Sequence, residues 1–301
     1  MELRVLQYFL AVAREQSISG AAESLHLSQP TLSTQLKGME DELGKQLLIR
    51  GTKGSRKVTL TEEGMILRKR AEEILSLVQK TQQEISNSDE TIVGDVYIGT
   101  GETDIVRLMA KAAKKIQEQY PEIHYHISSG NAEYVLEYLD KGLIDFGLIY
   151  GTADPQKYES VPIPFKDTWG VLMRRDSPLA RKEYIQPEDL WDKPLIVSHQ
   201  RSDNPYMSRW LKKDIAKLNV VATYNLVFNA SLLVDEGLGY ALIFNKLINT
   251  NGSNLCFRPL YPQLDAAACI IWKRYQIFSK AAECFLQNLQ EILLLDTDAG
   301  K

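Results

Sequence analysis

Two short helical patterns near the N-terminus, and the spacing between them, constrain this chain of 301 residues more than any other feature. The first pattern follows Ser17, a residue type that caps helices, and continues to Leu25. The second follows Ser28 and has a proline in its first turn, where helices tolerate one. Only His26 and Leu27 lie between the two patterns, and so short a connection is typical of a helix-turn-helix. The sequence therefore predicts this motif, preceded by a helix of about four turns.

The second helix of the predicted motif has one apolar face and one polar face. Leucine and methionine side chains repeat along the apolar face with helical spacing, and Gly44 ends the helix. No carboxylate precedes Glu40, and the polar face carries short donor and acceptor groups. These are Gln29, Thr31, Ser33, Thr34, Gln35 and Lys37. Such groups suit base edges and phosphates in a DNA major groove, whereas the alternative is a plain helical hairpin with a solvated polar face.

A basic segment follows this helix. Residues 44–60 contain no acid, and their five cations are Lys45, Arg50, Lys53, Arg56 and Lys57. A Gly-Thr-Lys-Gly-Ser turn separates two short runs of strand-forming residues, which predicts a β-hairpin wing. The whole chain has a net charge of −4, whereas residues 1–60 carry eight basic and six acidic side chains. This asymmetry favours DNA binding by the N-terminal part, with the wing cations meeting phosphates or the minor groove.

A long helix is predicted over residues 61–88, which contain no proline and a single glycine. Thr59 and Glu62 have the spacing of a capping box at its start. At 1.5 Å per residue the helix is about 40 Å long, and it carries one apolar stripe with heptad-like spacing. The stripe consists of Leu67, Ala71, Ile74, Val78 and Ile85. It packs either on its own domain or on a second chain, and its position between two domains favours the second chain.

Strand and helix patterns alternate after a polar hinge at residues 86–90. Strands are predicted at 93–101, 123–128, 145–150, 168–175, 194–199, 221–228 and 240–244. Helices are predicted at 104–120, 132–141, 205–213, 231–236 and 279–295, with a short one around Leu190. The alternation predicts an α/β fold after an all-α N-terminal part, with a mostly parallel sheet that binds ligands at the carboxyl ends of its strands.

Several short motifs are spread over nearly the whole chain. The N-terminal ones are Phe9-Leu-Ala-Val-Ala13, Ala21-Ala22-Glu-Ser-Leu25, Ser28-Gln-Pro-Thr-Leu-Ser-Thr-Gln-Leu36, Met39-Glu-Asp-Glu-Leu-Gly44 and Leu60-Thr-Glu-Glu-Gly64. The later ones are Val96-Tyr-Ile-Gly99, Tyr120-Pro121, Gly142-Leu-Ile-Asp145 and Leu238-Gly239. Together they resemble the motifs of LysR-type transcriptional regulators, with high specificity over the first sixty residues and a looser match afterwards.

The resemblance implies a winged helix-turn-helix at 1–60, a dimerising linker helix and hinge at 61–90, and an effector-binding domain at 91–301. That domain comprises two Rossmann-like subdomains of the periplasmic-binding-protein type, at about 91–161 with 267–301 and at about 162–266. The family also implies a cytoplasmic bacterial protein whose partners are its own copies in a dimer or tetramer, an inverted repeat of double-stranded DNA, a small effector and RNA polymerase. The positions that match the DNA-facing residues of the family are Gln29, Pro30, Ser33, Thr34, Arg50 and Lys53.

In such an architecture the effector lies in a cleft where strand ends face the N-termini of helices, which favour anions. Polar residues at the predicted strand-to-helix junctions are candidates for its lining. They are Thr100, Gly101, Glu102, Thr103, Ser129, Asn131, Ser198, His199, Gln200, Ser202 and Asn229. Their types suit hydrogen bonds to a small polar molecule, although each is equally well explained as an ordinary cap or turn residue. Glu102 argues against a simple dicarboxylate and favours a ligand with an amine or another cation.

Other classes of function have little support in the sequence. His124 and His126 have no third metal ligand nearby, and no phosphate loop, nucleophile elbow or dinucleotide fingerprint is present, so neither a metal, a cofactor nor an enzyme is predicted. The three separated cysteines suit a reducing compartment. No signal peptide is expected, and no apolar run approaches the roughly 18 residues of a membrane span. The competing hypothesis is a small-molecule-binding α/β protein with a helical N-terminal extension and no specific DNA target.

Overall fold

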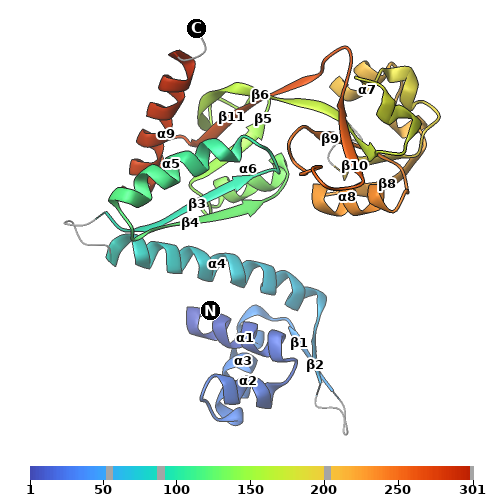
Figure 1. The fold of residues 1–301 in the computed structure, drawn as a ribbon. Coiled ribbons are helices and arrows are strands. Elements are labelled where there is room, and N and C mark those ends of the chain that lie inside the picture. The colour runs from blue at the N-terminus through green and yellow to red at the C-terminus, as the bar shows by residue number, and fades with distance from the viewer. Residues whose placement is uncertain (52–56, 87–91, 200–204, 299–301) are drawn as a thin grey trace. The chain divides into compact units, whose positions relative to one another are not determined.

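The computed structural model describes residues 1–51, 57–86, 92–199 and 205–298. The chain divides into two compact units, Met1–Ser88 and Asp89–Lys301 (Figure 1). Among the described residues, no helix is both long enough and apolar enough to cross a membrane.

The first unit begins with the three predicted helices, α1 (Leu3–Glu15), α2 (Ile18–Ser24) and α3 (Gln29–Leu43). Ser17 and Ser28 cap α2 and α3, because their hydroxyl oxygens accept the backbone N–H groups of Gly20 and Thr31. Gly44 ends α3 in the left-handed region at a φ of 63°. The predicted helix-turn-helix and both of its serine caps are therefore confirmed.

The core of the first unit lies where these helices meet. Phe9 of α1 and Leu32 and Leu36 of α3 are fully buried in one apolar cluster. Ala21 and Ala22 of α2 belong to the same cluster, and their small side chains allow a close approach between helices. The apolar face of α3 is therefore buried in the core, and the polar face of α3 remains in contact with solvent.

A two-stranded wing and a long helix complete the first unit. β1 (Leu48–Arg50) pairs antiparallel with β2 (Val58–Leu60), and Leu48 lies opposite Leu60. Thr61 caps the start of α4 (Glu62–Ser86), because its hydroxyl oxygen accepts the N–H of Gly64 at 3.0 Å. The predicted capping box on Thr59 is therefore wrong, because Thr59 lies in β2 and pairs with β1.

The apolar stripe of α4 is divided between two environments. Ala71 is fully buried in the core of the first unit, and Leu67 and Ile74 pack against that core. Ile85 at the far end of the same stripe is 80% exposed. The first half of the stripe therefore packs within its own unit, contrary to the expectation that the whole stripe faces a second chain.

The second unit is built on a mixed sheet. In the described part of the chain its strands form one nine-stranded sheet in the order β4-β3-β5-β11-β6-β9-β7-β8, with β10 paired to β6. The strands are β3 (Gly94–Thr100), β4 (Ile123–Ser129), β5 (Phe146–Tyr150), β6 (Tyr158–Arg174), β7 (Leu195–Ser198), β8 (Val220–Tyr224), β9 (Tyr240–Phe244), β10 (Leu255–Pro259) and β11 (Asp265–Lys273). The helices are α5 (Val106–Gln119), α6 (Ala132–Asp140), α7 (Pro205–Leu211), α8 (Val227–Asp235) and α9 (Lys280–Asp298).

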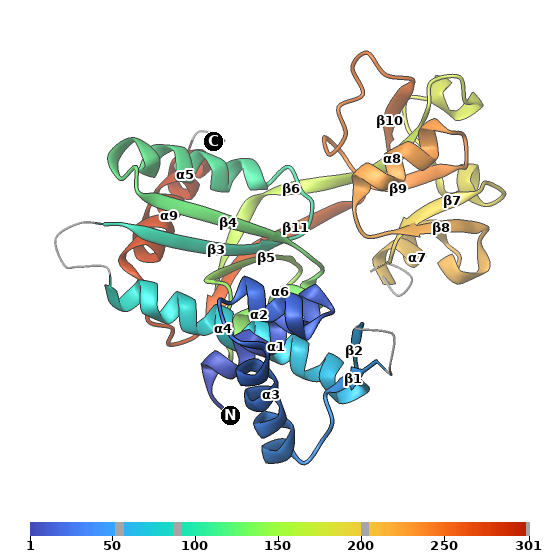
Figure 2. The ribbon, with the colours of Figure 1, turned by 90° about the horizontal axis from the view of Figure 1, so that it is seen from below.

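The first lobe of this unit consists of β3, β4 and β5 with α5, α6 and α9, and Figure 2 shows α5 and α9 on one face of its sheet and α6 on the other. Successive residues of β5 alternate between these faces, since Phe146 and Leu148 pack with α5 and α9 whereas Ile149 packs with α6. The predicted return of the last helix to the first half of this region is confirmed, because α9 packs against α5.

The second lobe consists of β7 to β10 with α7 and α8, and its sheet is also covered on both faces. Leu195 and Val197 of β7 pack with α7, whereas Ile196 packs with α8. Both lobes are parallel inside, because β3 pairs parallel with β4 and β5, and β7 pairs parallel with β8 and β9.

The long strands β6 and β11 run antiparallel through both lobes and join them (Figures 1 and 2). These strands make the sheet mixed, where a mostly parallel one was expected. β6 starts ten residues before the predicted strand, and β10 and β11 were not predicted. Two further expectations are corrected: the helix at Leu190 is a 3-10 turn (Pro187–Leu190), and the strand at 221–228 ends at Tyr224, where the chain turns into α8.

Candidate functional site

The exposed face of α3 carries the side chains that were predicted to contact DNA. Five of them are exposed and Ser33 is half-buried; the exposed ones are Gln29, Pro30, Thr31, Thr34 and Lys37. Because Leu32, Leu36 and Met39 bury the opposite side, this face is fixed in its orientation by the core. The arrangement presents one row of amide, hydroxyl and ammonium groups on a rigid helix, as major-groove contact requires.

Two hydrogen bonds set the start of this row. The hydroxyl of Ser19 on α2 donates to the side-chain oxygen of Gln29 at 3.1 Å. The Thr31 side chain, two residues after Gln29, is hydrogen-bonded to the capping Ser28, with 2.7 Å between the two hydroxyl oxygens. With its oxygen engaged by Ser19, Gln29 has the two N–H donors of its amide to offer an outside acceptor.

The wing is attached to α3 through one carboxylate, that of Glu40. Its Oε1 accepts the backbone N–H groups of Leu47 and Leu48 at 2.8 and 3.0 Å, and its Oε2 accepts from Arg50 Nη2 at 3.1 Å. The Glu40 side chain is only 11% exposed, whereas that of Arg50 is 41% exposed. Arg50, a predicted DNA contact, thus also ties β1 to α3, the predicted recognition helix of the helix-turn-helix. The other two predicted wing contacts, Lys53 and Arg56, lie outside the described residues.

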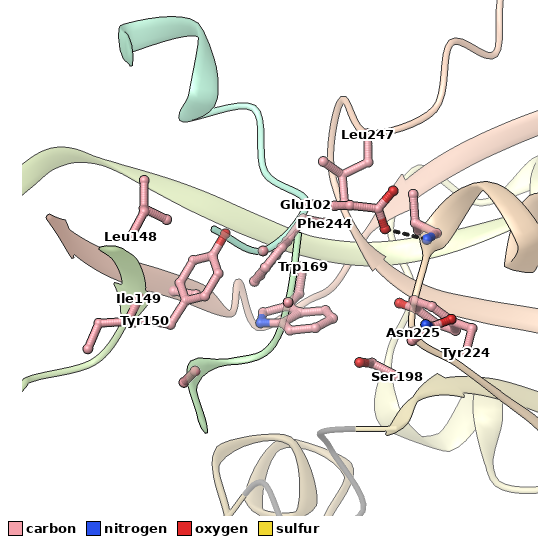
Figure 3. A pocket seen from close by; sticks show the side chains of 15 residues that line it. Glu102, Leu148, Ile149, Tyr150, Trp169, Ser198, Tyr224, Asn225, Phe244 and Leu247 are labelled. Carbon is pink, nitrogen blue, oxygen red and sulfur yellow. Dashed lines mark hydrogen bonds between the residues drawn. The ribbon is translucent and has the colours of Figure 1, made fainter. Parts of the chain in front are cut away.

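The second unit contains a cavity of about 250 Å³ between its two lobes (Figure 3). Gly101, Gly130 and Ala132 line it from the first lobe, and Ser198 and Asn225 from the second. Several side chains in its wall stand on the last residue of a strand. These are Tyr150 of β5, Ser198 of β7, Tyr224 of β8 and Phe244 of β9. The cavity therefore lies where both parallel sheets end, as binding sites in open α/β sheets do.

Aromatic rings form one wall of this cavity. The ring centroids of Trp169 and Phe244 are 4.2 Å apart, and those of Tyr150 and Phe244 are 4.9 Å apart. The Tyr150 hydroxyl donates to Asp167, a buried carboxylate in β6 that also accepts from Thr103. Trp169 lies in β6 itself and Tyr150 is hydrogen-bonded to that strand, so both rings are anchored to the strand that joins the lobes. Figure 3 shows Trp169 between Tyr150 on one side and Asn225 and Ser198 of the second lobe on the other.

One hydrogen bond crosses the cavity from lobe to lobe. The backbone N–H of Val227, the first residue of α8, donates to Oε2 of Glu102, which follows β3 (Figure 3). The residue before α8, Leu226, supplies no side-chain cap. Glu102 therefore caps α8 from the other lobe, and its negative charge is favourable at the positive end of the helix.

A second cavity of about 260 Å³ adjoins the first and shares Gly101, Glu102, Gly130 and Asn225 with it. Ser129, Asn131 and Tyr134 complete its first-lobe side, with His199 and Leu226 opposite. Burial raises the pKa of Tyr134, and a hydrogen bond with Tyr138 raises it further. Polar groups thus concentrate in this second cavity, beside the aromatic wall of the first.

The predicted effector residues divide into four groups. Gly101, Glu102, Ser129, Asn131, Ser198 and His199 line one or both cavities. Thr100 and Thr103 are buried, and the Thr103 hydroxyl lies 2.5 Å from Asp167 Oδ2. Asn229 is exposed on α8 and lines neither cavity. Gln200 and Ser202 lie outside the described residues.

The aromatic wall and Asn225 were not predicted. The prediction rested on polar residues at strand-to-helix junctions, and apolar rings do not show that pattern. A usable signal was present, because Tyr150 and Phe244 are the final residues of predicted strands and parallel strands end at the ligand-binding edge.

His124 and His126 lie in separate surroundings on β4. His126 Nε2 lies 2.7 Å from Asp95 Oδ1, and its ring stacks on Tyr97 with centroids 4.6 Å apart. His124 is exposed on β4. Among the described residues, no cluster of three or more histidine, cysteine, aspartate or glutamate side chains could hold a metal ion.

Comparisons with known proteins agree with this architecture. The family described as "Bacterial regulatory helix-turn-helix protein, lysR family" matches residues 3–65, and the "LysR substrate binding domain" family matches residues 90–293. The uncharacterized HTH-type transcriptional regulator YvbU of Bacillus subtilis (strain 168) is 24% identical over 97% of this chain and 99% of that protein. A hydrogen peroxide-inducible genes activator of Pectobacterium carotovorum is 30% identical over 65% of this chain and 64% of its own length.

The fold matches a solved structure over nearly all of the chain. The crystal structure of CbnR, a LysR family transcriptional regulator, superimposes with a TM-score of 0.77 at 18% identity, covering 97% of this chain and 99% of CbnR. The relatives are named as a transcriptional regulator and a gene activator, which is the predicted class of protein. With a helix-turn-helix domain followed by an effector-binding domain, the chain belongs to the LysR family of DNA-binding transcriptional regulators.

Proposed function

We propose that this regulator binds an inverted repeat of double-stranded DNA as a homodimer or homotetramer in the cytoplasm, and that a small effector in the cavity beside Glu102 changes that binding. Residues 1–60 contact DNA, 61–90 link and dimerise, and 91–301 bind the effector in lobes at about 91–161 with 267–301 and at about 162–266. RNA polymerase is the further partner that the family resemblance implies. The proposed DNA contacts are Gln29, Pro30, Thr31, Ser33, Thr34, Lys37, Arg50, Lys53 and Arg56.

The observation that carries the effector proposal is the composition of the cavity wall. Residues of both lobes line it, and the Glu102–Val227 hydrogen bond joins the lobes at its edge. A ligand placed there contacts both lobes at once. It therefore binds one relative arrangement of the lobes better than another, which is the condition for a ligand to shift a conformational equilibrium.

A cavity-filling substitution tests this proposal. Ala132 is exposed at the start of α6 and lines the first cavity, so Ala132→Trp fills the space without a clash in the core. Glu118→Trp on the exposed side of α5 is the matched control. An operator is first selected from random duplexes, and a set of small metabolites is then screened for a change in its affinity for the full-length protein. We expect every active compound to lose its effect in Ala132→Trp and keep it in Glu118→Trp; an undiminished response of Ala132→Trp places the effector elsewhere.

A further inference from the structure

The charge of the first cavity has one sign. Among the described residues that line it, Glu102 is the single charged side chain, and no lysine or arginine is among them. The adjoining cavity adds one titratable base, His199, and no other acid among its described lining residues. A ligand that enters this space meets a carboxylate and no permanent cation from that lining.

Aromatic faces complement this carboxylate. Trp169, Phe244 and Tyr150 form a continuous wall, with successive centroids 4.2 and 4.9 Å apart. The quadrupole of such rings attracts a cation, and the attraction is strongest for tryptophan and where water is excluded. Trp169 and Phe244 are 4% and 3% exposed, so this wall is shielded from solvent.

The one hydroxyl of the three-ring aromatic wall, that of Tyr150, is already engaged as a donor. The Tyr150 hydroxyl donates its hydrogen bond to Asp167, so this hydroxyl is not available as a donor to a ligand. The N-terminus of α8 would ordinarily favour an anion, but Glu102 already accepts the Val227 N–H there. An acidic effector would have to displace Glu102 and would remain beside its displaced charge. A donor-rich, positively charged effector meets neither obstacle.

We infer that the effector is a small organic cation, an ammonium group attached to a flat apolar body. The ammonium faces Glu102, and the flat body lies along Trp169 and Phe244. This inference rests on the proposed function, because it names the ligand class of the same cavity. Val227 engages Oε2 of Glu102, and the proposed cation pairs with the same carboxylate. The bound cation and α8 then share Glu102, and the cation strengthens the bridge between the lobes.

Matched probes of different charge test the inference on the full-length protein by isothermal titration calorimetry. The phenyl series is 2-phenylethylamine, 2-phenylethanol and phenylacetate, and the indole series is tryptamine, tryptophol and indole-3-acetate. We expect the amine of at least one series to bind about tenfold more tightly than the alcohol, which corresponds to about 1.4 kcal/mol. The acid of the same series is expected to bind more weakly than the alcohol.

Substitutions identify the group responsible. Glu102→Gln removes the charge but keeps an oxygen that can accept from Val227, and it is expected to reduce the affinity of the amine to that of the alcohol. Glu122→Gln removes an exposed glutamate outside both cavities and is expected to retain the full preference. The thermal unfolding midpoint of each unliganded variant checks that its fold is retained.

The remaining outcomes separate this inference from the proposed function. If the acids bind as tightly as the amines, or if Glu102→Gln keeps the preference, the cationic class is wrong. Loss of that acid binding in Ala132→Trp would then retain the cavity as the effector site. If none of the six probes binds the wild-type protein, the inference is also overturned. Amine binding that survives in Ala132→Trp contradicts both proposals.

Discussion

Glu40 anchors the wing to the recognition helix, and its removal is expected to weaken the first unit selectively. Glu40→Ala deletes the acceptor of the Leu47 and Leu48 N–H groups, on residues that are 2% and 1% exposed. A hydrogen bond to a charged group contributes about 1.5–3 kcal/mol, and a partly exposed ion pair such as that with Arg50 contributes less than about 1 kcal/mol. We therefore expect a loss of about 3 kcal/mol in the free energy of unfolding of this unit, or about 12–24 °C in its midpoint.

Two spectroscopic signals separate the units in this experiment. All four tryptophans lie in the second unit, at positions 169, 191, 210 and 272, whereas the first unit is largely helical. Circular dichroism at the helical band is therefore expected to show an earlier transition in Glu40→Ala, while the tryptophan fluorescence transition stays in place. Glu40→Gln keeps an acceptor oxygen and is expected to lose only about 1 kcal/mol. Asp41→Ala, the exposed neighbour, is the control; if Glu40→Ala unfolds as late as Asp41→Ala, the carboxylate does not anchor the wing.

Three further predictions concern packing and redox chemistry. Gly64→Ala places a Cβ 2.2 Å from the Leu47 carbonyl oxygen. We therefore expect the free energy of unfolding of the first unit to fall by about 1–3 kcal/mol, measured by the same dichroism transition. An unchanged transition would show that the backbone relaxes freely. Ile74→Asp puts a carboxylate against the core of the first unit and is expected to destabilise that unit by about 2 kcal/mol. The control Leu77→Asp changes a 42% exposed position and should leave the unfolding midpoint of the unit unchanged. Equal midpoints for the two variants would refute the packing assignment. Burial raises the pKa of Cys269 and keeps it a thiol, and none of the three cysteines forms a disulfide. Hydrogen peroxide at neutral pH is therefore expected to leave operator affinity unchanged. A change in operator affinity that a triple cysteine-to-serine variant abolishes would contradict this expectation.

The helix-turn-helix could be predicted because its determinants are local. Ser17 and Ser28 cap the helices that follow them, and Gly44 supplies the left-handed residue that ends α3. Each of these signals acts within a few residues of its own position, so a single sequence displays it without knowledge of the fold. The same holds for most helices and strands of the lobes, whose periodicity follows their own buried faces.

The strands that join the lobes were hidden by residues that usually mark loops. β6 contains Pro162 and Pro164, and a proline cannot donate to a strand neighbour. In the structure Pro162 lies opposite Cys269, next to an irregularity in the pairing of β6 with β11. A break in regular pairing is where a sheet tolerates proline, but its position depends on a partner strand more than a hundred residues away.

The candidate site was half visible in the sequence for a related reason. Glu102 and Ser198 could be found because polar residues at strand-to-helix junctions stand out. Tyr150 and Phe244 look like core residues, and only the meeting of two lobes turns them into a cavity wall. The contact between Glu102 and Val227 joins residues 125 positions apart, so no local pattern could reveal it.

The central claim, that α3 reads a DNA sequence within a regulator, is tested most directly by selection of the full-length protein against random duplexes at about 150 mM salt. We expect an enriched inverted repeat whose half-sites are about one helical turn or a multiple of it apart, because paired recognition helices enter grooves on one face of the duplex. The double variant Gln29→Ala, Ser33→Ala is expected to lose this enrichment while keeping salt-dependent affinity for any duplex. Failure of the folded wild-type protein to enrich any sequence, or enrichment of the same repeat by the double variant, would contradict the account.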